Sequence, residues 1–137
     1  MTQIREVMTD QVETCEPSTT VLEAARIMAK SDVGPIPVVE NGRPVGLVTD
    51  RDIVVRAVAD GRDPQMTTVG EIASTNLVTV EPEQSLEEAL ELMARRQLRR
   101  LPVVEGEKLV GIVAQADVAR SADARATGDV VHDISQK

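Results

Sequence analysis

The feature that most constrains the fold of this chain is an internal repeat with a spacing of 65 residues. Aligning residues 4–53 with residues 69–118 needs no gap and gives 16 identities in 50 positions. The alignment places Asp52 on Asp117 and keeps prolines and glycines in one register. Chance similarity between two patterns of helices and strands does not explain such a register. The sequence therefore predicts two tandem copies of one small structural unit.

Each copy has the pattern of a β-α-β-β-α unit. In the first copy, Thr20 and Glu23 form a capping-box pattern before apolar residues at helical spacing. Asn41-Gly42 is a hairpin signal between two β-branched segments. The expected elements are a helical lead-in over residues 4–8, a strand over 12–14, a helix from 21 to about 31, strands over 36–39 and 45–48, and a helix that begins at Asp50 and buries Ile53, Val54, Ala57 and Val58.

The composition requires the two copies to pack together. The chain has 137 residues and no Phe, Tyr or Trp, so each half can build only a thin core of aliphatic side chains. We expect an α+β fold in which two units pack through their sheets with pseudo-twofold symmetry. The expected divisions are residues 1–65 for the first unit, 66–126 for the second, and 127–137 for a polar C-terminal tail.

Charge and cysteine content exclude several classes of protein. A net charge of −8 argues against a nucleic-acid or anionic-membrane surface. The single cysteine, Cys15, cannot form an internal disulfide, and the chain has neither a leader-like start nor an apolar run of spanning length. Cys15 and His132 lie far apart and match no metal-ligand spacing. The sequence predicts a cytoplasmic protein without a metal centre.

Catalysis has little support in the sequence. No nucleophile has a base at a recognisable spacing, and the glycines at 42, 46 and 61 are isolated rather than part of a phosphate-binding loop. The pattern therefore favours a protein that is not an enzyme.

The segment Gly46–Asp52 is the first candidate for a ligand site. It runs from the end of a buried strand into a helix, with Asp50 as the expected N-cap. Ligands often bind at such positions in α/β structures, and the hydroxyl of Thr49 with the carboxylate of Asp52 can hold a ribose. The alternative is that Asp52, like Asp117, only stabilises its helix through the helix dipole.

Arg99 and Arg100 are the second candidate. They follow the helix whose Glu91 and Arg95 form an i,i+4 pair, and no glutamate at helical spacing pairs with both of them. Adjacent guanidiniums before a strand suit a phosphate group, which arginine grips through two hydrogen bonds. A solvated surface or an interface ion pair is the alternative interpretation.

The repeated ending, Pro-Val-Val followed by Gly, Val and Asp, resembles the CBS domain, and two copies resemble the tandem pair called a Bateman module. The resemblance covers about residues 4–124, and the stretch from Leu47 to Pro64 is similar to small stand-alone CBS pairs. It implies sheets packed face to face, frequent dimerisation, and clefts that bind adenosine nucleotides or adenosyl compounds in some members.

Carried over position by position, the resemblance implies one well-equipped cleft. Thr49 and Asp52 match its ribose pair, and Arg99 and Arg100 match the basic pair that reaches the phosphates from the opposite unit. The adenine would lie between backbone near the first strand and an apolar residue before a proline; the matching positions are Thr14, Cys15, Ile36 and Pro37.

The second cleft matches the family pattern only in part. Asp117 is present, but Ala114 replaces the threonine, and the positions across the seam are the uncharged Gly34 and Pro35. Arg51 adjoins the symmetric position and can compensate in part. This cleft is expected to hold a neutral adenosyl group or nothing.

Three functions remain at this point. The first is a regulatory homodimer that binds AMP, ADP or ATP, with magnesium admitted alongside a polyphosphate, and signals to a separate protein partner. The second is a ligand-independent dimerisation or protein-interaction module. An enzyme is the third and has the weakest support.

Overall fold

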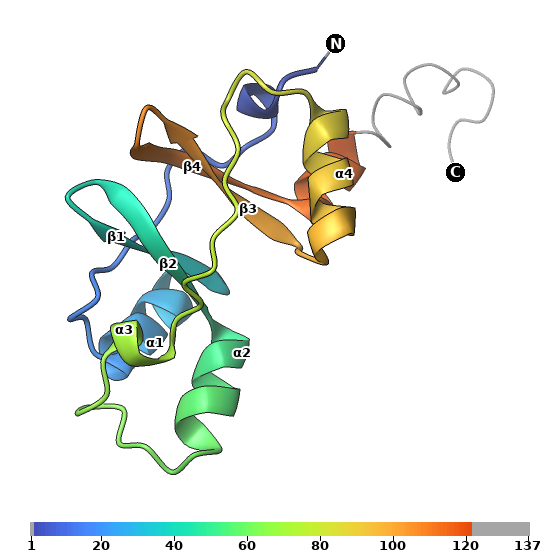
Figure 1. Cartoon of the computed structure of the whole chain (residues 1–137). Coiled ribbons are helices and arrows are strands. Elements are labelled where there is room, and N and C mark those ends of the chain that lie inside the picture. Colours follow the sequence, from blue (N-terminus) through green and yellow to red (C-terminus); the bar gives the residue numbers. More distant parts are fainter. Residues whose placement is uncertain (1, 122–137) are drawn as a thin grey trace.

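The two copies of the repeat form the same elements at the same register. The computed structural model describes residues 2–121, and it shows an α+β fold made of two similar units (Figure 1). The predicted tail, with His132, lies outside the described residues, and the division of the chain at residues 65 and 66 stays a prediction. The main elements are α1 (Val21–Ser31), β1 (Pro35–Glu40) and β2 (Arg43–Thr49) in the first unit, and α4 (Leu86–Arg96), β3 (Arg100–Glu105) and β4 (Lys108–Ala114) in the second.

The two main helices begin with the same kind of capping box. The Thr20 hydroxyl accepts a hydrogen bond from the Glu23 backbone N at 3.1 Å, and the Glu23 carboxylate accepts from the Thr20 backbone N at 3.0 Å. Ser85 and Glu88 repeat this capping box at α4. Such boxes satisfy backbone donors that the first helical turn leaves unpaired. The sequence prediction for these helix starts is confirmed.

Each unit contains one antiparallel hairpin. The turn between β1 and β2 uses Asn41 at φ 57° and Gly42 at φ 82°, the conformations that a type I′ turn needs. The expected strand over residues 12–14 is absent. Instead, Cys15 makes a single parallel bridge to Val38, and its backbone N donates to the Pro37 carbonyl at 3.1 Å. The prolines of this region leave too few donors for a longer ladder.

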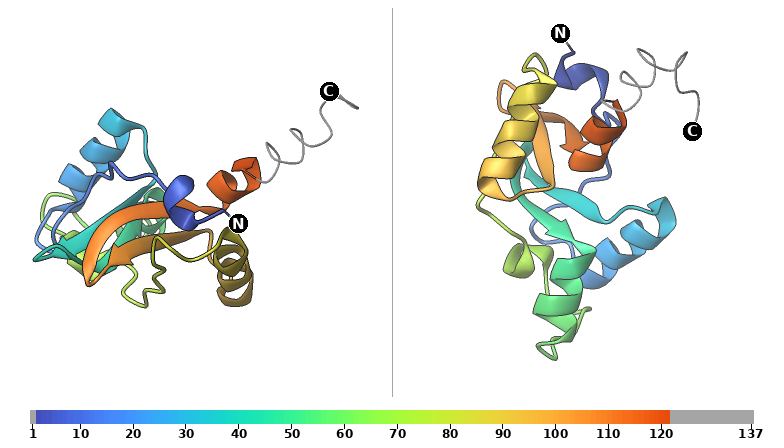
Figure 2. Two further views of the ribbon diagram at one scale, coloured as in Figure 1. Left: turned by 90° about the horizontal axis from the view of Figure 1, so that it is seen from above. Right: turned by 90° about the vertical axis from the view of Figure 1, so that its right-hand side faces the viewer.

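The lead-in segments are exchanged between the units. The short 3-10 helix η1 (Ile4–Glu6) belongs to the first repeat but packs on the second unit, where the Ile4 backbone N donates to the Gln84 carbonyl at 2.8 Å. Its counterpart α3 (Val69–Ile72) packs on the first unit, where the Val69 N donates to the Thr19 carbonyl at 2.8 Å. Figures 1 and 2 show the dark blue lead-in beside α4, and Figure 1 shows α3 beside α1.

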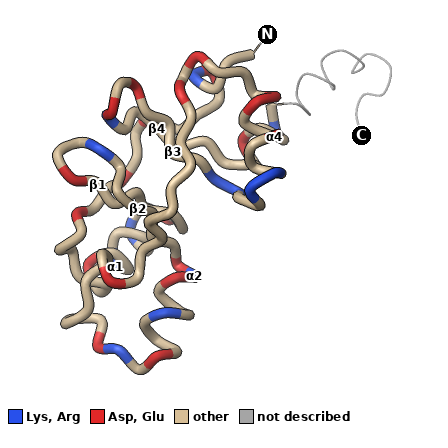
Figure 3. The backbone as a smooth tube through the Cα atoms, viewed as in Figure 1, with Lys and Arg blue, Asp and Glu red and all other residues tan. Residues whose placement is uncertain are grey.

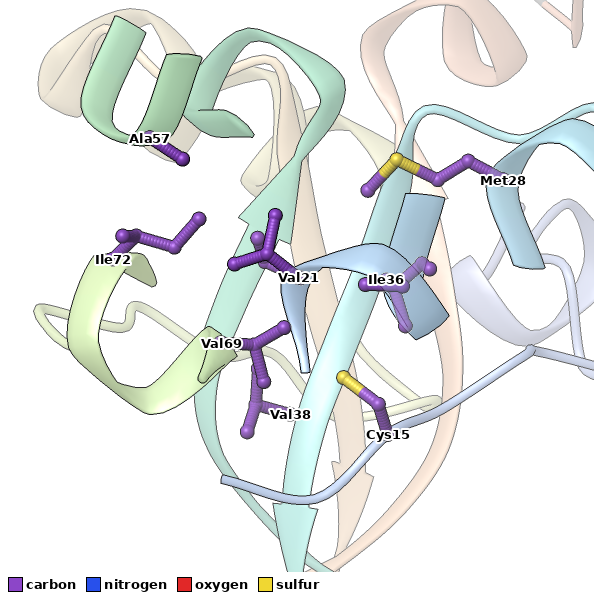
Figure 4. Packing of buried hydrophobic residues seen from close by; sticks show 10 residues of the cluster. Cys15, Val21, Met28, Ile36, Val38, Ala57, Val69 and Ile72 are labelled. Atoms are coloured by element: carbon purple, nitrogen blue, oxygen red, sulfur yellow. The ribbon is translucent and has the colours of Figure 1, made fainter. Parts of the chain in front are cut away.

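Each unit has its own core, which the exchanged segment completes. Figure 4 shows Val69 and Ile72 facing Val21 and Val38 in the first core. In the second core, Ile4 is fully buried and packs in a cluster with Val80, Leu86, Leu101 and Val113. Because each half takes part of its core from the other repeat, neither half buries its apolar surface alone.

The units also contact each other through β2 and β4. Near the hairpin tips, the Leu109 backbone N donates to the Gly42 carbonyl at 3.0 Å, and Arg43 pairs with Glu107 at 2.6 Å. The bridges that join Thr9 to Ile112 and Leu47 to Ser74 are related by the 65-residue shift. This reciprocal pattern gives the pair its pseudo-twofold symmetry.

The helix after β2 differs from the sequence prediction. Its first turn is α2 (Asp50–Asp52), and it continues as a π-helix, η2 (Ile53–Val58). The N-cap is Thr49 rather than Asp50, because Thr49 and Asp52 form a reciprocal capping box. Of the four residues expected to be buried, Ala57 is buried and Ile53 is half-buried against the first core. Val54 and Val58 are exposed, because π-helical spacing rotates them away from the core.

One consequence is an exposed group of aliphatic side chains, which we call the valine patch: Val54, Val55 and Val58. Their side chains are 57%, 48% and 65% exposed.

In the described part of the chain, no helix is both long and apolar enough to cross a membrane.

Candidate functional site

Among the cavities that lie where strands end and helices begin, two are lined by residues of both units. The Thr49 cavity has a volume of about 450 Å³ and is lined by β2 and α2 residues, including Leu47, Thr49 and Arg51, and by the segment Gln97–Arg100 that joins α4 to β3. Residues of both units therefore form it, at the carboxyl end of β2. Volumes of about 300–1,000 Å³ are usual for small-molecule sites.

The Thr49 cavity is basic. Arg51, Arg99 and Arg100 line it, opposed by the carboxylate of Asp50. Within residues 2–121, none of the three guanidiniums has an ion pair or a hydrogen bond to another side chain, whereas Arg5, Arg43, Arg62, Arg95 and Arg120 all pair with carboxylates. Figure 3 shows basic residues gathered where α4 ends and β3 begins. In an acidic protein, arginines without carboxylate partners leave their donors available to an anion.

Thr49 and Asp52 are held in place by each other. The Thr49 hydroxyl accepts from the Asp52 backbone N at 3.1 Å, and the Asp52 carboxylate accepts from the Thr49 backbone N at 2.9 Å. Thr49 lines the cavity, but Asp52 is not among its lining residues. In this structure Asp52 caps the helix, which was the alternative interpretation of its role, and a ribose contact by Asp52 stays a prediction.

The Asp117 cavity, of about 400 Å³, is the pseudo-symmetric counterpart of the Thr49 cavity. Thr9, Gln11 to Glu13 and Ser31 to Pro35 line it from the first unit, and Arg100, Ile112, Ala114 and Asp117 from the second. Asp117 accepts from the Ala114 backbone N at 3.2 Å and pairs with Arg120. In the described part of the chain, the lining includes the carboxylates of Glu13, Asp32 and Asp117 but only one guanidinium, that of Arg100.

Four residues predicted to hold an adenine are outside the lining of these two cavities, and their contact with an adenine stays a prediction. Cys15, Ile36 and Pro37 are buried, and Thr14 is exposed; none of them lines the Thr49 or the Asp117 cavity. Cys15 and Ile36 lie within the first core (Figure 4). An alternating strand pattern suits a core as well as a ligand cleft, so the sequence could not separate the two.

Sequence reasoning also missed two groups of lining residues. Gln11 precedes the expected first strand, Val12 and Glu13 lie within it, and Gln97 and Leu98 follow α4. Arg51, expected near the second cleft, lines the Thr49 cavity instead. The left-handed Gln97 (φ 57°) ends α4 and turns the following residues back toward the sheet. The sequence carries no signal for this turn, because such positions are usually occupied by Gly or Asn.

Cys15 is poorly suited to metal binding or catalysis. Its sulfur lies 3.9 Å from the Pro37 carbonyl oxygen, and burial raises the pKa of the thiol to about 11. The thiolate is the form that ligates metals and attacks substrates, and it is scarce at neutral pH. Among the residues that the structure describes, no group of three or more His, Cys, Asp or Glu could hold a metal ion.

Comparisons with known proteins agree with this architecture. The model of the CBS domain matches residues 4–58 and again residues 69–123. The CBS domain-containing protein YhcV of Bacillus subtilis is 51% identical over 119 residues, which is 87% of this chain and 84% of that protein.

Two further relatives have solved structures. Hypoxic response protein 1 of Mycobacterium tuberculosis is 39% identical over 121 residues, or 88% of this chain and 85% of that protein. Its structure, solved with two coordinated zinc ions, matches with a TM-score of 0.78 and covers 88% of this chain and 99% of that one. The CBS domain pair of protein MJ0100, solved with 5'-methylthioadenosine and S-adenosyl-L-methionine, matches with a TM-score of 0.82 at 25% identity and covers 91% of this chain and 98% of that one.

The two matched regions are the two copies of the repeat, and they span most of the chain. This protein therefore belongs to the CBS-domain family, as a tandem pair of CBS domains.

Proposed function

We propose that this protein is a cytoplasmic, non-enzymatic sensor of adenosine nucleotides that binds the phosphate groups of AMP, ADP or ATP in the Thr49 cavity. The observation that carries the proposal is the set of three guanidiniums, on Arg51, Arg99 and Arg100, that line one cavity without carboxylate partners in the described part of the chain. Their donors suit a phosphate, and the Thr49 hydroxyl lies in the same cavity.

Support for the adenosyl part of the ligand comes from the family. The MJ0100 CBS pair was solved with two adenosyl compounds, and its fold matches this chain over 91% of its length. The Thr49 cavity receives residues from both units, so a bound nucleotide would hold Arg51 of the first unit and Arg99 of the second together. A ligand that prefers one arrangement of the units can shift their equilibrium, which is the physical basis of a signal.

Thermal unfolding in the presence of nucleotides tests this proposal. A ligand at 100 times its dissociation constant adds about 2.7 kcal/mol to the free energy of unfolding. AMP, ADP or ATP is therefore expected to raise Tm by several degrees, while GMP and inorganic phosphate at the same concentration should raise it less. If no adenosine compound shifts Tm at millimolar concentration, the sensor proposal is wrong.

A second candidate function is a ligand-independent homodimerisation module, and the valine patch favours it. Three neighbouring aliphatic side chains are about half exposed or more on one helix, and they carry no charge in a chain of net charge −8. In a twofold-symmetric dimer the valine patch would face the same patch of a second copy. No carboxylates of the patch residues would then meet at this contact, because their side chains are uncharged. The dimer and the nucleotide site are compatible with each other.

We expect the double substitution Val55→Glu and Val58→Glu to convert a dimer into a monomer, because two buried carboxylates facing their copies would be uncompensated. Sedimentation equilibrium measures the mass directly. Val45→Glu is the matched control, since Val45 is exposed on β2 outside the patch. Retention of the dimer by the double variant would place the interface elsewhere.

A further inference from the structure

Among residues 2–121, Arg100 is the one arginine that lines both the Thr49 cavity and the Asp117 cavity. It opens β3, opposite Ala114 of β4, and its side chain is half-buried. Its neighbour Arg99 lines the Thr49 cavity but not the Asp117 cavity. The symmetry-related position in the first unit is Pro35, so the protein has no second guanidinium at the matching place.

The two cavities differ in the charge that surrounds Arg100. On the side of Thr49, Arg51 and Arg99 oppose one carboxylate, that of Asp50. On the side of Asp117, Arg100 itself is the one cation among the lining residues that the structure describes. Removing its charge from that side leaves the carboxylates of Glu13, Asp32 and Asp117.

Two of these carboxylates already have partners, which limits how strongly they can hold the Arg100 guanidinium on this side. The Glu13 carboxylate accepts a hydrogen bond from the Ser31 hydroxyl at 3.1 Å, and Asp117 pairs with Arg120. Within residues 2–121, the guanidinium of Arg100 has no such partner. It is therefore free to turn toward whichever cavity holds an anion.

We infer that Arg100 couples the two cavities. An anion bound beside Thr49 draws the guanidinium toward itself, and the Asp117 cavity is then surrounded by carboxylates and binds a cationic adenosyl compound more tightly. The inference rests on the proposed function, because it requires that the Thr49 cavity bind a nucleotide phosphate.

Two physical arguments give the coupling its sign. A guanidinium that grips a phosphate through two hydrogen bonds has a fixed orientation and cannot serve the other cavity at the same time. Coupling of binding free energies is reciprocal, so a cation beside Asp117 must strengthen anion binding beside Thr49 by the same factor. Two anionic ligands would instead compete for one guanidinium. The protein is thus expected to bind one anionic and one cationic adenosyl ligand together.

Titration calorimetry with AMP as the anionic probe and S-adenosylmethionine as the cationic probe tests this coupling. In the unmodified protein, saturating AMP is expected to tighten S-adenosylmethionine binding at least fivefold, and saturating S-adenosylmethionine should tighten AMP binding by the same factor. In Arg100→Gln the factor should fall below twofold, and S-adenosylmethionine alone should bind more tightly than it does to the unmodified protein.

Arg99→Gln is the matched control. It removes one cation from the Thr49 cavity but none from the lining of the Asp117 cavity. We expect it to weaken AMP binding while the coupling factor, measured at saturating AMP, remains at least fivefold.

The outcomes separate this inference from the proposed function. If both probes bind without affecting each other, if they compete, or if Arg100→Gln keeps the coupling, the inference is wrong and the nucleotide site stands. If only AMP binds, the inference is again wrong and the nucleotide site again stands. If only S-adenosylmethionine binds, or neither probe does, the coupling is wrong, and the proposed function is wrong as well when ADP and ATP also fail to bind.

Discussion

Replacing Ile4 by Ala is expected to lower the free energy of unfolding by about 2–5 kcal/mol, the usual range for truncating a buried isoleucine. Ile4 is fully buried, although it lies at the start of the chain. Its side chain belongs to the second core, and its backbone N donates to the Gln84 carbonyl at 2.8 Å. The loss should therefore appear first in the second unit, although Ile4 belongs to the first repeat.

Urea unfolding followed by circular dichroism measures the size of this effect, and native-state hydrogen exchange shows where it acts. Amides of α4 and β3 should exchange faster in Ile4→Ala. The symmetry-related variant Val69→Ala should instead loosen α1 and β1, because Val69 is buried in the first core. Val54→Ala truncates an exposed side chain and is expected to change stability by less than about 0.5 kcal/mol. Faster exchange in the first unit of Ile4→Ala would contradict the exchanged packing.

The double substitution Arg99→Gln and Arg100→Gln is expected to weaken AMP binding by about 100-fold or more. Hydrogen bonds to a charged group contribute about 1.5–3 kcal/mol each, and two of them amount to at least about 3 kcal/mol. Each 1.4 kcal/mol is a tenfold change in affinity. Titration calorimetry measures the dissociation constant, and increasing salt should narrow the difference between the variant and the unmodified protein.

Arg95→Gln with Arg96→Gln is the matched control for this variant. Arg95 and Arg96 are the adjacent basic pair on the last turn of α4, they are exposed, and they do not line the Thr49 cavity. This control makes the same change in net charge. Equal weakening of AMP binding by the two double variants would show that overall charge, rather than the cavity, attracts the nucleotide.

Most of the secondary structure could be predicted from the sequence, because its signals are local. The capping boxes at Thr20 and Ser85 and the turn at Asn41-Gly42 each depend on a few neighbouring residues. Because the repeat has one register, each element predicted for the first unit is also predicted at the matching position of the second. Family membership and the α+β fold followed from the same residues, and both are confirmed.

The exchange of the lead-ins could not be predicted in this way. The apolar residues around Ile4 and Val69 indicate that each lead-in is buried, but they are equally compatible with either core. The choice is made by backbone hydrogen bonds between distant segments, such as that from Ile4 to Gln84. Pattern analysis of one sequence contains no information about such long-range partners.

The candidate site was only partly accessible to sequence reasoning. Arg99, Arg100 and Thr49 line one cavity, and the resemblance to CBS pairs, carried over position by position, had implied that the two clefts would differ in charge. Cys15 and Ile36 lie in the core instead, because a β-branched or small apolar residue suits both environments. The π-helix was also outside the prediction, since its five-residue hydrogen bonds leave no distinctive pattern in the residues from Ile53 to Val58.

The exchanged lead-ins have a consequence for synthesis on the ribosome. Ile4 is translated about a hundred residues before its partners Leu101 and Val113. Until then the nascent lead-in carries an apolar surface with nothing to cover it, and the closing contact joins segments that are far apart in the sequence. Such a chain is expected to complete its folding only after the second unit has been translated, and a fragment ending near residue 65 would be a client for chaperones rather than an independent domain.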